Sequence, residues 1–225
     1  GLALLALAPA VTTASLGLLA ILYGAVGVVW VSWTVVGGCL GVVGVAALLG
    51  LLLRPRPADT PARRGGGMLM ATGIGIGVVL TAIRLVLYIE EPAAISQTND
   101  AVFHLNALEW ILQTQNASSL SLPGVVDASG FYPGAWHAIA SATALISGVS
   151  LPTAANLVSI VVGALAWPVG IAWFTRVVTG GSTIATAASG VLSAVMPAFP
   201  MLMVQWGVLY PYGLSVALLA PAAGA

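Results

Sequence analysis

The first 53 residues contain no charged side chain, and this constrains the fold more than any motif in the chain. A helix that crosses a bilayer needs about 20 predominantly apolar residues. Residues 1–53 are therefore long enough for two crossings joined by a tight turn, which we place between Tyr23 and Trp33. Tyr23, Trp30 and Trp33 would then lie at one membrane interface, where aromatic side chains with a polar edge are enriched.

The composition of the whole chain has the same character. Hydrophobic residues make up 60% of it and charged residues 5%, whereas soluble domains carry about a quarter charged residues. This predicts an all-α, polytopic transmembrane helix bundle of about seven spans. The net charge of zero and the lack of a basic patch argue against a nucleic-acid partner. Because the chain stops at Ala225 inside an apolar run, we expect it to be part of a longer polypeptide.

An Arg- and Pro-rich linker at 54–67 divides this N-terminal pair of helices from the rest of the chain, 68–225. Four of the six basic residues, all of them Arg, lie in the linker. An excess of positive charge in a short loop marks the cytoplasmic side of a membrane. The linker is therefore predicted to be cytoplasmic, in a protein of the plasma membrane.

The crossings that follow decide the side of each later loop. Residues 68–89 are expected to cross outward, which puts the next loop on the extracytoplasmic face. Further crossings are expected at 131–149, 152–174 and 183–206, with another beginning near Val208. This order places Arg176 outside, in conflict with the positive-inside rule. Pro197 and Pro200 should kink the span that contains them.

The predicted outer loop, 90–134, is the part of the chain where we expect chemistry. Together with the start of the next span it holds five of the six carboxylates and both histidines. Thr98 or Asn99 is a natural N-cap, and Asp100 follows in the first turn, where the helix dipole favours a carboxylate. We predict an amphipathic helix from about Thr98 to Gln113 along the membrane surface, with Asp100 and His104 on one face.

An Asp and a His four residues apart have three chemical uses. They can form a general base oriented by an imidazole, a pair of metal ligands, or a capping carboxylate beside a structural histidine. A metal site would need Glu90, Glu91 or His137 as further donors, and none of them has a diagnostic spacing. The residues leave a divalent metal possible and its ligands unknown.

Two other groups flank this helix. Tyr132 and Trp136 lie where the chain re-enters the membrane, and interfacial anchoring explains them as well as substrate binding does. His137 would line a cavity together with His104. Arg84 lies near the outer end of its span, where it either snorkels to lipid phosphate or faces the bundle and holds a lipid-linked phosphate.

The order of these features resembles the GT-C superfamily of polytopic glycosyltransferases, and within it the actinobacterial relatives of mannosyl- and arabinofuranosyltransferases. The resemblance covers about residues 68–206. It is carried by Asn99-Asp100-Ala101-Val102-Phe103-His104, by Tyr132-Pro133 before Trp136-His137, and by Gly148-Val149-Ser150-Leu151-Pro152. The two spans before the linker depart from the family, in which the catalytic loop often follows the first span directly.

The resemblance implies a membrane enzyme that moves a sugar from a polyprenyl-phosphate donor to a glycan, lipid or protein acceptor of the cell envelope. Asp100 takes the place of the catalytic carboxylate, and His104 would assist it by hydrogen bonding. The expected substrate-binding residues are Arg84, Glu90, Glu91, Tyr132, Trp136 and His137.

Two other classes stay open on the sequence alone. A transporter or lipid flippase would use Arg84 and the helix kinked by Pro197 and Pro200 as a substrate path. A non-catalytic assembly subunit would need none of these residues. The gathering of ionisable groups in one outer loop, rather than along the spans, favours the transferase.

Overall fold

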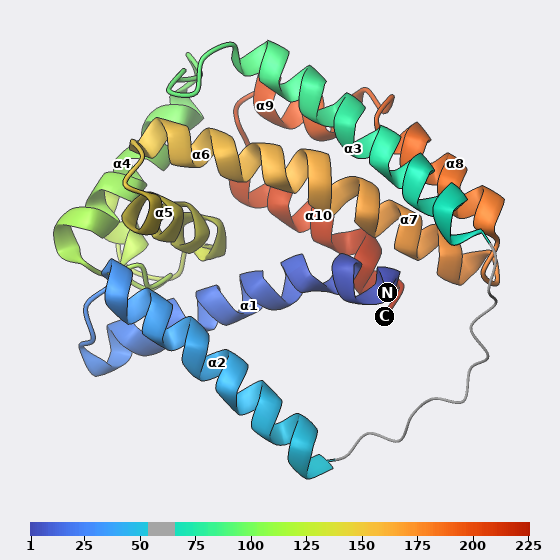
Figure 1. The fold of residues 1–225 in the computed structure, drawn as a ribbon. Coiled ribbons are helices and arrows are strands. Elements are labelled where there is room, and N and C mark those ends of the chain that lie inside the picture. The colour runs from blue at the N-terminus through green and yellow to red at the C-terminus, as the bar shows by residue number, and fades with distance from the viewer. Residues whose placement is uncertain (54–65) are drawn as a thin grey trace.

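The computed structural model describes residues 1–53 and 66–225, and every regular element in this part of the chain is helical (Figure 1). The expected linker, 54–67, falls almost wholly on 54–65, outside the described residues. The elements are α1 (Leu2–Val26), α2 (Ser32–Leu53), α3 (Gly67–Ile89), α4 (Asn99–Thr114), η1 (Leu122–Val126), α5 (Ala135–Ser147), α6 (Leu151–Ile160), η2 (Val161–Ala166), α7 (Trp167–Val178), α8 (Thr183–Ser193), η3 (Ala198–Leu202), α9 (Met203–Gln205) and α10 (Tyr210–Ala223).

In the described part of the chain, five helices are long and apolar enough to cross a membrane, and the protein is therefore a multipass membrane protein. They are α1, α2, α3, the continuous run Leu151–Val178, and Thr183–Gln205. This confirms the predicted all-α membrane bundle. The two halves of the run Leu151–Val178, α6 and α7, are joined without a break by the π-helical turns of η2.

The turn between α1 and α2 forms where the sequence predicts it. Gly27 ends α1 in the left-handed conformation, with φ 71°, which glycine adopts without steric cost. The Tyr23 hydroxyl donates a hydrogen bond to the carbonyl of Thr34 at 2.9 Å and so ties the two helices together.

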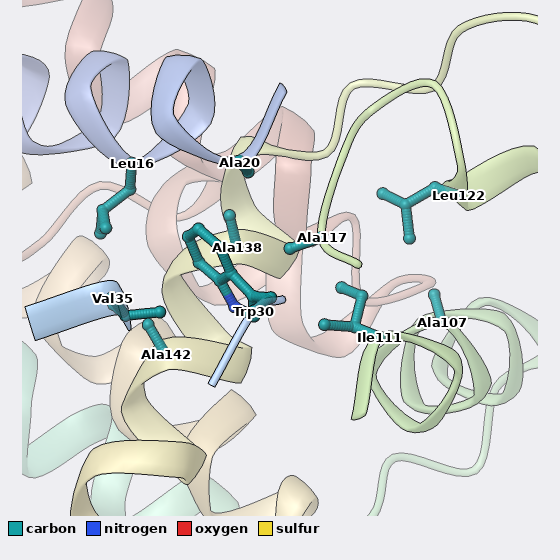
Figure 2. Close-up of a cluster of buried hydrophobic side chains, with 10 residues drawn as sticks. All are labelled: Leu16, Ala20, Trp30, Val35, Ala107, Ile111, Ala117, Leu122, Ala138 and Ala142. Carbon is teal, nitrogen blue, oxygen red and sulfur yellow. The ribbon is translucent and has the colours of Figure 1, made fainter. Parts of the chain in front are cut away.

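Trp30, in this turn, has a different environment from the one expected. Its side chain is 1% exposed, and it lies at the centre of a buried cluster formed by α1, α2, α4 and α5 (Figure 2). The indole N–H donates to Ser141 Oγ at 3.1 Å, and the backbone N–H donates to the carbonyl of Gln115 at 2.7 Å. Trp30 therefore packs the turn onto α5 and the end of α4, whereas Trp33 is 72% exposed as an interfacial residue would be.

α3 and α8 pack with their backbones in contact. Gly73 faces Ala187, and Gly77, one turn later, faces Gly190. A Cβ atom at Gly77 would overlap the carbonyl oxygen of Gly190, so the close approach depends on the absence of a side chain. Glycines four residues apart allow helices in lipid to pack in this way.

The expected crossing at 131–149 is wrong, because α5 is too short to span a membrane. α5 has 13 residues, which give a length of about 20 Å against the roughly 30 Å of a bilayer core. Gly148, with φ 71°, ends α5, and α6 then starts near α4 rather than at the opposite end (Figure 1). α10, with 14 residues, is short for the same purpose. The described part of the chain thus holds five candidate spans rather than about seven.

The position of Arg176 follows from this correction. Because α5 turns back, α6 and α7 run from the end of the bundle near α4, here named the α4 end, to the end where α3 begins, here named the linker end. Arg176 lies at the linker end, where it donates to the Gly181 carbonyl and to Met70 Sδ, both at 3.1 Å. Arg176 therefore lies at the same end as the start of α3, which follows the Arg-rich linker in sequence, and its expected conflict with the positive-inside rule disappears.

The span from α8 to α9 is interrupted, as its prolines predict. Phe199 has the extended backbone angles φ −123° and ψ 137°. A break of this kind leaves carbonyl groups of the preceding turn without helical partners. Arg84 donates a hydrogen bond to the Ala194 carbonyl, and Trp167 Nε1 donates to the Ser193 carbonyl at 3.3 Å. Arg84 therefore faces the bundle and satisfies the broken end of α8.

Candidate functional site

α4 is the helix that the sequence predicts from about Thr98 to Gln113. Thr98 is its N-cap, with the hydroxyl accepting from the Ala101 N–H at 3.3 Å, and Gln115 ends the helix in the left-handed conformation. The helix is amphipathic, with one face buried against α5, α6 and η1. The buried residues are Ala101, His104, Ala107, Leu108 and Ile111.

A pair of histidines joins α4 to α5. His104 Nδ1 and His137 Nε2 are 3.0 Å apart and share a hydrogen bond. Both side chains are buried, with His104 4% and His137 0% exposed. His137 Nδ1 is buried as well and has no hydrogen-bond partner among residues 1–53 and 66–225. The sequence predicts that both histidines line one cavity. In the structure they contact each other, and His137 is the more deeply buried of the two.

Both histidines are neutral at pH 7. Burial lowers the pKa of His104 from 6.5 to about 4, against the opposing charge of Asp100. Burial, and then the neighbouring His104, lower the pKa of His137 to about 3. Desolvation disfavours an imidazolium, so the pair is held together as a donor and an acceptor and not as a charged group.

Aromatic rings surround the pair. Tyr210, at the start of α10, stacks on Trp136 with the ring centroids 4.5 Å apart and the planes 8° apart. The Tyr210 ring also lies 5.3 Å from the His104 ring. Tyr132 lies 5.5 Å from His137, and Phe103 lies 5.1 Å from Tyr132. These contacts bring α4, α5, α10 and the 131–134 segment together at one point.

Asp100 lies at the rim of this cluster. The residue is exposed, and its carboxylate borders Gly207, where a Cβ atom would come within 2.7 Å of Asp100 Oδ2. Burial, and then the charge of Asp100, raise the pKa of Tyr132, so the carboxylate acts on both Tyr132 and His104. Asp100 is thus an accessible carboxylate beside a buried, neutral imidazole.

A polar cleft of about 360 Å³ opens next to the cluster. It lies between α3, α6 and α10, beneath the 94–97 segment, and Val208 beside Gly207 forms part of its wall. Its polar lining comes from Tyr88, Glu90, Ser96, Gln97, Asn156, Ser159 and Tyr210. Ser159, Val204 and Tyr210 also line a small, largely apolar pocket of about 20 Å³ that reaches Trp136 and Phe199. The polar cleft therefore adjoins a small apolar space inside the bundle.

The structure brings together most of the predicted site residues. Asp100, His104, Tyr132, Trp136 and His137 form one cluster, and Glu90 lines the cleft beside it. Glu91 lines only a neighbouring groove, and Arg84 is bonded to α8 instead.

Sequence reasoning missed Tyr210 and Asn156. Tyr210 begins an apolar run and resembles an ordinary interfacial tyrosine, and its stacking on Trp136 depends on how α10 folds back. Asn156 has a buried amide side chain within a candidate membrane span. A polar residue inside an apolar span indicates a functional site, and this signal is visible in the sequence.

A metal site needs several ligating side chains close together. Among residues 1–53 and 66–225, no group of three or more His, Cys, Asp or Glu side chains could hold a metal ion. The two histidines bond to each other through the nitrogens that face one another. The described residues therefore offer no ligand set for the divalent metal that the sequence leaves possible.

The fold and this cluster define a multipass membrane protein with a polar cleft at one end of its bundle. The chain belongs to DUF6541, a family of unknown function, whose model matches residues 1–225. No curated protein and no solved structure matches the chain.

Proposed function

We propose that this protein is a glycosyltransferase that moves a sugar from a polyprenyl-phosphate donor to an acceptor of the cell envelope. The observation that supports this most is the placement of Asp100. It is an exposed carboxylate on the first turn of α4, and it borders Gly207, whose neighbour Val208 lines a polar cleft that adjoins a small apolar pocket. A lipid-linked sugar has the same two parts, a polar head and an apolar chain.

In the proposed reaction Asp100 is the general base. It takes the proton of an acceptor hydroxyl, whose oxygen attacks the anomeric carbon of the donor sugar. The bond between that carbon and the phosphate oxygen breaks, and polyprenyl phosphate leaves with the bonding electrons. A single displacement of this kind inverts the anomeric centre.

The histidine pair positions the base in this proposal. His104, one turn after Asp100, is held by its hydrogen bond to His137 and by the surrounding rings. A rigid neutral imidazole shapes the wall beside the carboxylate without neutralising its charge. His137 is buried and acts only through His104.

Arg84 has no part in binding the donor phosphate in this proposal, although the sequence suggested that part for it. Its guanidinium is bonded to the Ala194 carbonyl at the broken end of α8, and it does not line the cleft. The proposal therefore assigns Arg84 to the stability of the bundle and gives it no part in binding the donor phosphate.

Sugar transfer by the purified protein from polyprenyl-phosphate donors tests this function. Asp100→Asn should lower the rate by about 10²- to 10⁴-fold, because Asn has nearly the size of Asp but accepts no proton. Glu109→Gln is the matched control, since Glu109 is an exposed carboxylate on the opposite face of α4. Near-normal transfer by a folded Asp100→Asn protein would remove Asp100 from the mechanism.

A transporter or lipid flippase is the second candidate, and the interruption of the α8–α9 span favours it. Phe199 and Pro200, at the break, line the apolar pocket beside the cleft. Interrupted helices that border a cavity are typical of transporter binding sites. Movement of a labelled lipid-linked sugar across proteoliposomes, with no covalent transfer to any acceptor, would support this alternative.

A further inference from the structure

A second space adjoins the cleft between the outer parts of α3 and α6. It is a groove of about 140 Å³ with apolar walls, among them Val86 and Ile89 on α3 and Leu157 and Ile160 on α6. Both helices belong to candidate spans. Val86 and Leu157 are exposed along it, so in a membrane this groove faces lipid.

The groove and the cleft adjoin. Ile89, Glu90 and Asn156 line both of them. A molecule with an apolar chain in the groove would therefore hold its head at the entrance of the polar cleft. This arrangement fits a membrane lipid better than a solute from water, because the walls of the groove offer apolar contacts over most of their area.

The charged side chains at the groove are both carboxylates. Glu90 and Glu91 lie at its end, and no basic side chain is among the residues that line the groove or the cleft. Asn156 fixes the segment that follows these carboxylates, since its amide donates to the carbonyls of Pro92 and Ala94 at 3.0 and 2.8 Å. The two neighbouring carboxylates are exposed, and they attract an ammonium group.

We infer that this groove binds a membrane lipid whose headgroup carries a primary ammonium. Its chain lies between α3 and α6, and its ammonium group lies between the carboxylates of Glu90 and Glu91. The inference does not depend on the proposed transfer reaction, because binding requires neither Asp100 nor the histidine pair.

Native mass spectrometry of the purified full chain tests this inference with two lipids of equal chain length, dioleoyl phosphatidylethanolamine and dioleoyl phosphatidylglycerol. The ethanolamine lipid should bind about tenfold more tightly, because only its head offers an ammonium group to the carboxylates. The double variant Glu90→Gln, Glu91→Gln should lose this preference, and Glu109→Gln should keep it. Leu157→Trp, which fills the groove, should weaken the binding of both lipids.

A ligand-side control keeps the test decisive if a variant fails to fold. The N-acetylated ethanolamine lipid has no ammonium group and should bind the unaltered protein no better than the glycerol lipid. Equal binding of all three lipids, or an unchanged preference in the folded double-glutamine variant, would overturn the inference. Loss of sugar transfer in Asp100→Asn leaves this result unaffected, so the two proposals fail separately.

Discussion

His104 and His137 show at the residue scale how burial changes the role of a polar side chain. Both were candidates for direct contact with substrate, and each is instead enclosed by rings and bonded to the other. A neutral pair of this kind is stable only while neither imidazole gains a proton. The pair therefore links the stability of the α4–α5 contact to pH.

The first residue-scale prediction is a loss of stability in mild acid. The folded-state pKa values, about 4 for His104 and about 3 for His137, lie below the ordinary 6.5. Below pH 6.5 the unfolded chain binds protons that the folded chain does not, so stability falls as the pH drops from 6.5 towards 4. Between pH 7 and pH 5 we expect a loss of about 2–4 kcal/mol for the two groups together.

Thermal unfolding of the detergent-purified protein at pH 7 and pH 5 measures this loss. His137→Asn removes one of the two titrating groups and should make the pH dependence shallower, even though it lowers stability at pH 7. Equal unfolding temperatures at both pH values would show that the pair is already protonated or is not buried.

At the scale of elements, α3 and α8 depend on their glycines. Gly77 leaves no room for a Cβ atom against the Gly190 backbone, whereas Gly75, on the same helix, has nothing within 4 Å of its Cβ position. Alanine at Gly77 would add both a steric overlap and a change in helix propensity, whereas alanine at Gly75 would change helix propensity alone.

The element-scale prediction compares Gly77→Ala with Gly75→Ala. Gly77→Ala should lower stability by about 1–3 kcal/mol, because α8 must move away from α3. Gly75→Ala should be neutral or should stabilise by up to about 1 kcal/mol, since alanine favours a helix more than glycine does. Thermal denaturation in one detergent compares them. A similar effect of both substitutions would mean that the close packing of α3 and α8 is absent.

At the scale of the whole molecule, the two ends of the bundle differ in charge. The described carboxylates lie in the segments of the α4 end, from Glu90 to Asp127, whereas Arg176 lies at the linker end. With four more Arg in the linker, the positive-inside rule predicts that the linker end faces the cytoplasm.

The whole-molecule prediction is tested by cysteine labelling of intact cells in a Cys39→Ala background. Asp127→Cys, at the α4 end, should react with an impermeant reagent, and Thr179→Cys, after α7, should not, because both positions are exposed but lie at opposite ends of the bundle. If α5 crossed the membrane, as its sequence suggested, position 179 would be labelled from outside. Labelling of position 179 but not 127 would invert the whole topology.

The sequence alone determined the class of fold, a turn between Tyr23 and Trp33, the helix from about Thr98 and the interruption of the span that contains Pro197 and Pro200. Each of these depends on hydropathy, capping or proline geometry, which act over a few neighbouring residues. Only the tertiary structure decided that α5 turns back, that Trp30 is buried and that Arg84 bonds to α8. Lipid and protein interior are equally apolar, so hydropathy cannot tell a helix that crosses the bilayer from one enclosed by its neighbours. The pairing of His104 with His137, 33 residues apart, likewise depends on how α4 packs against α5.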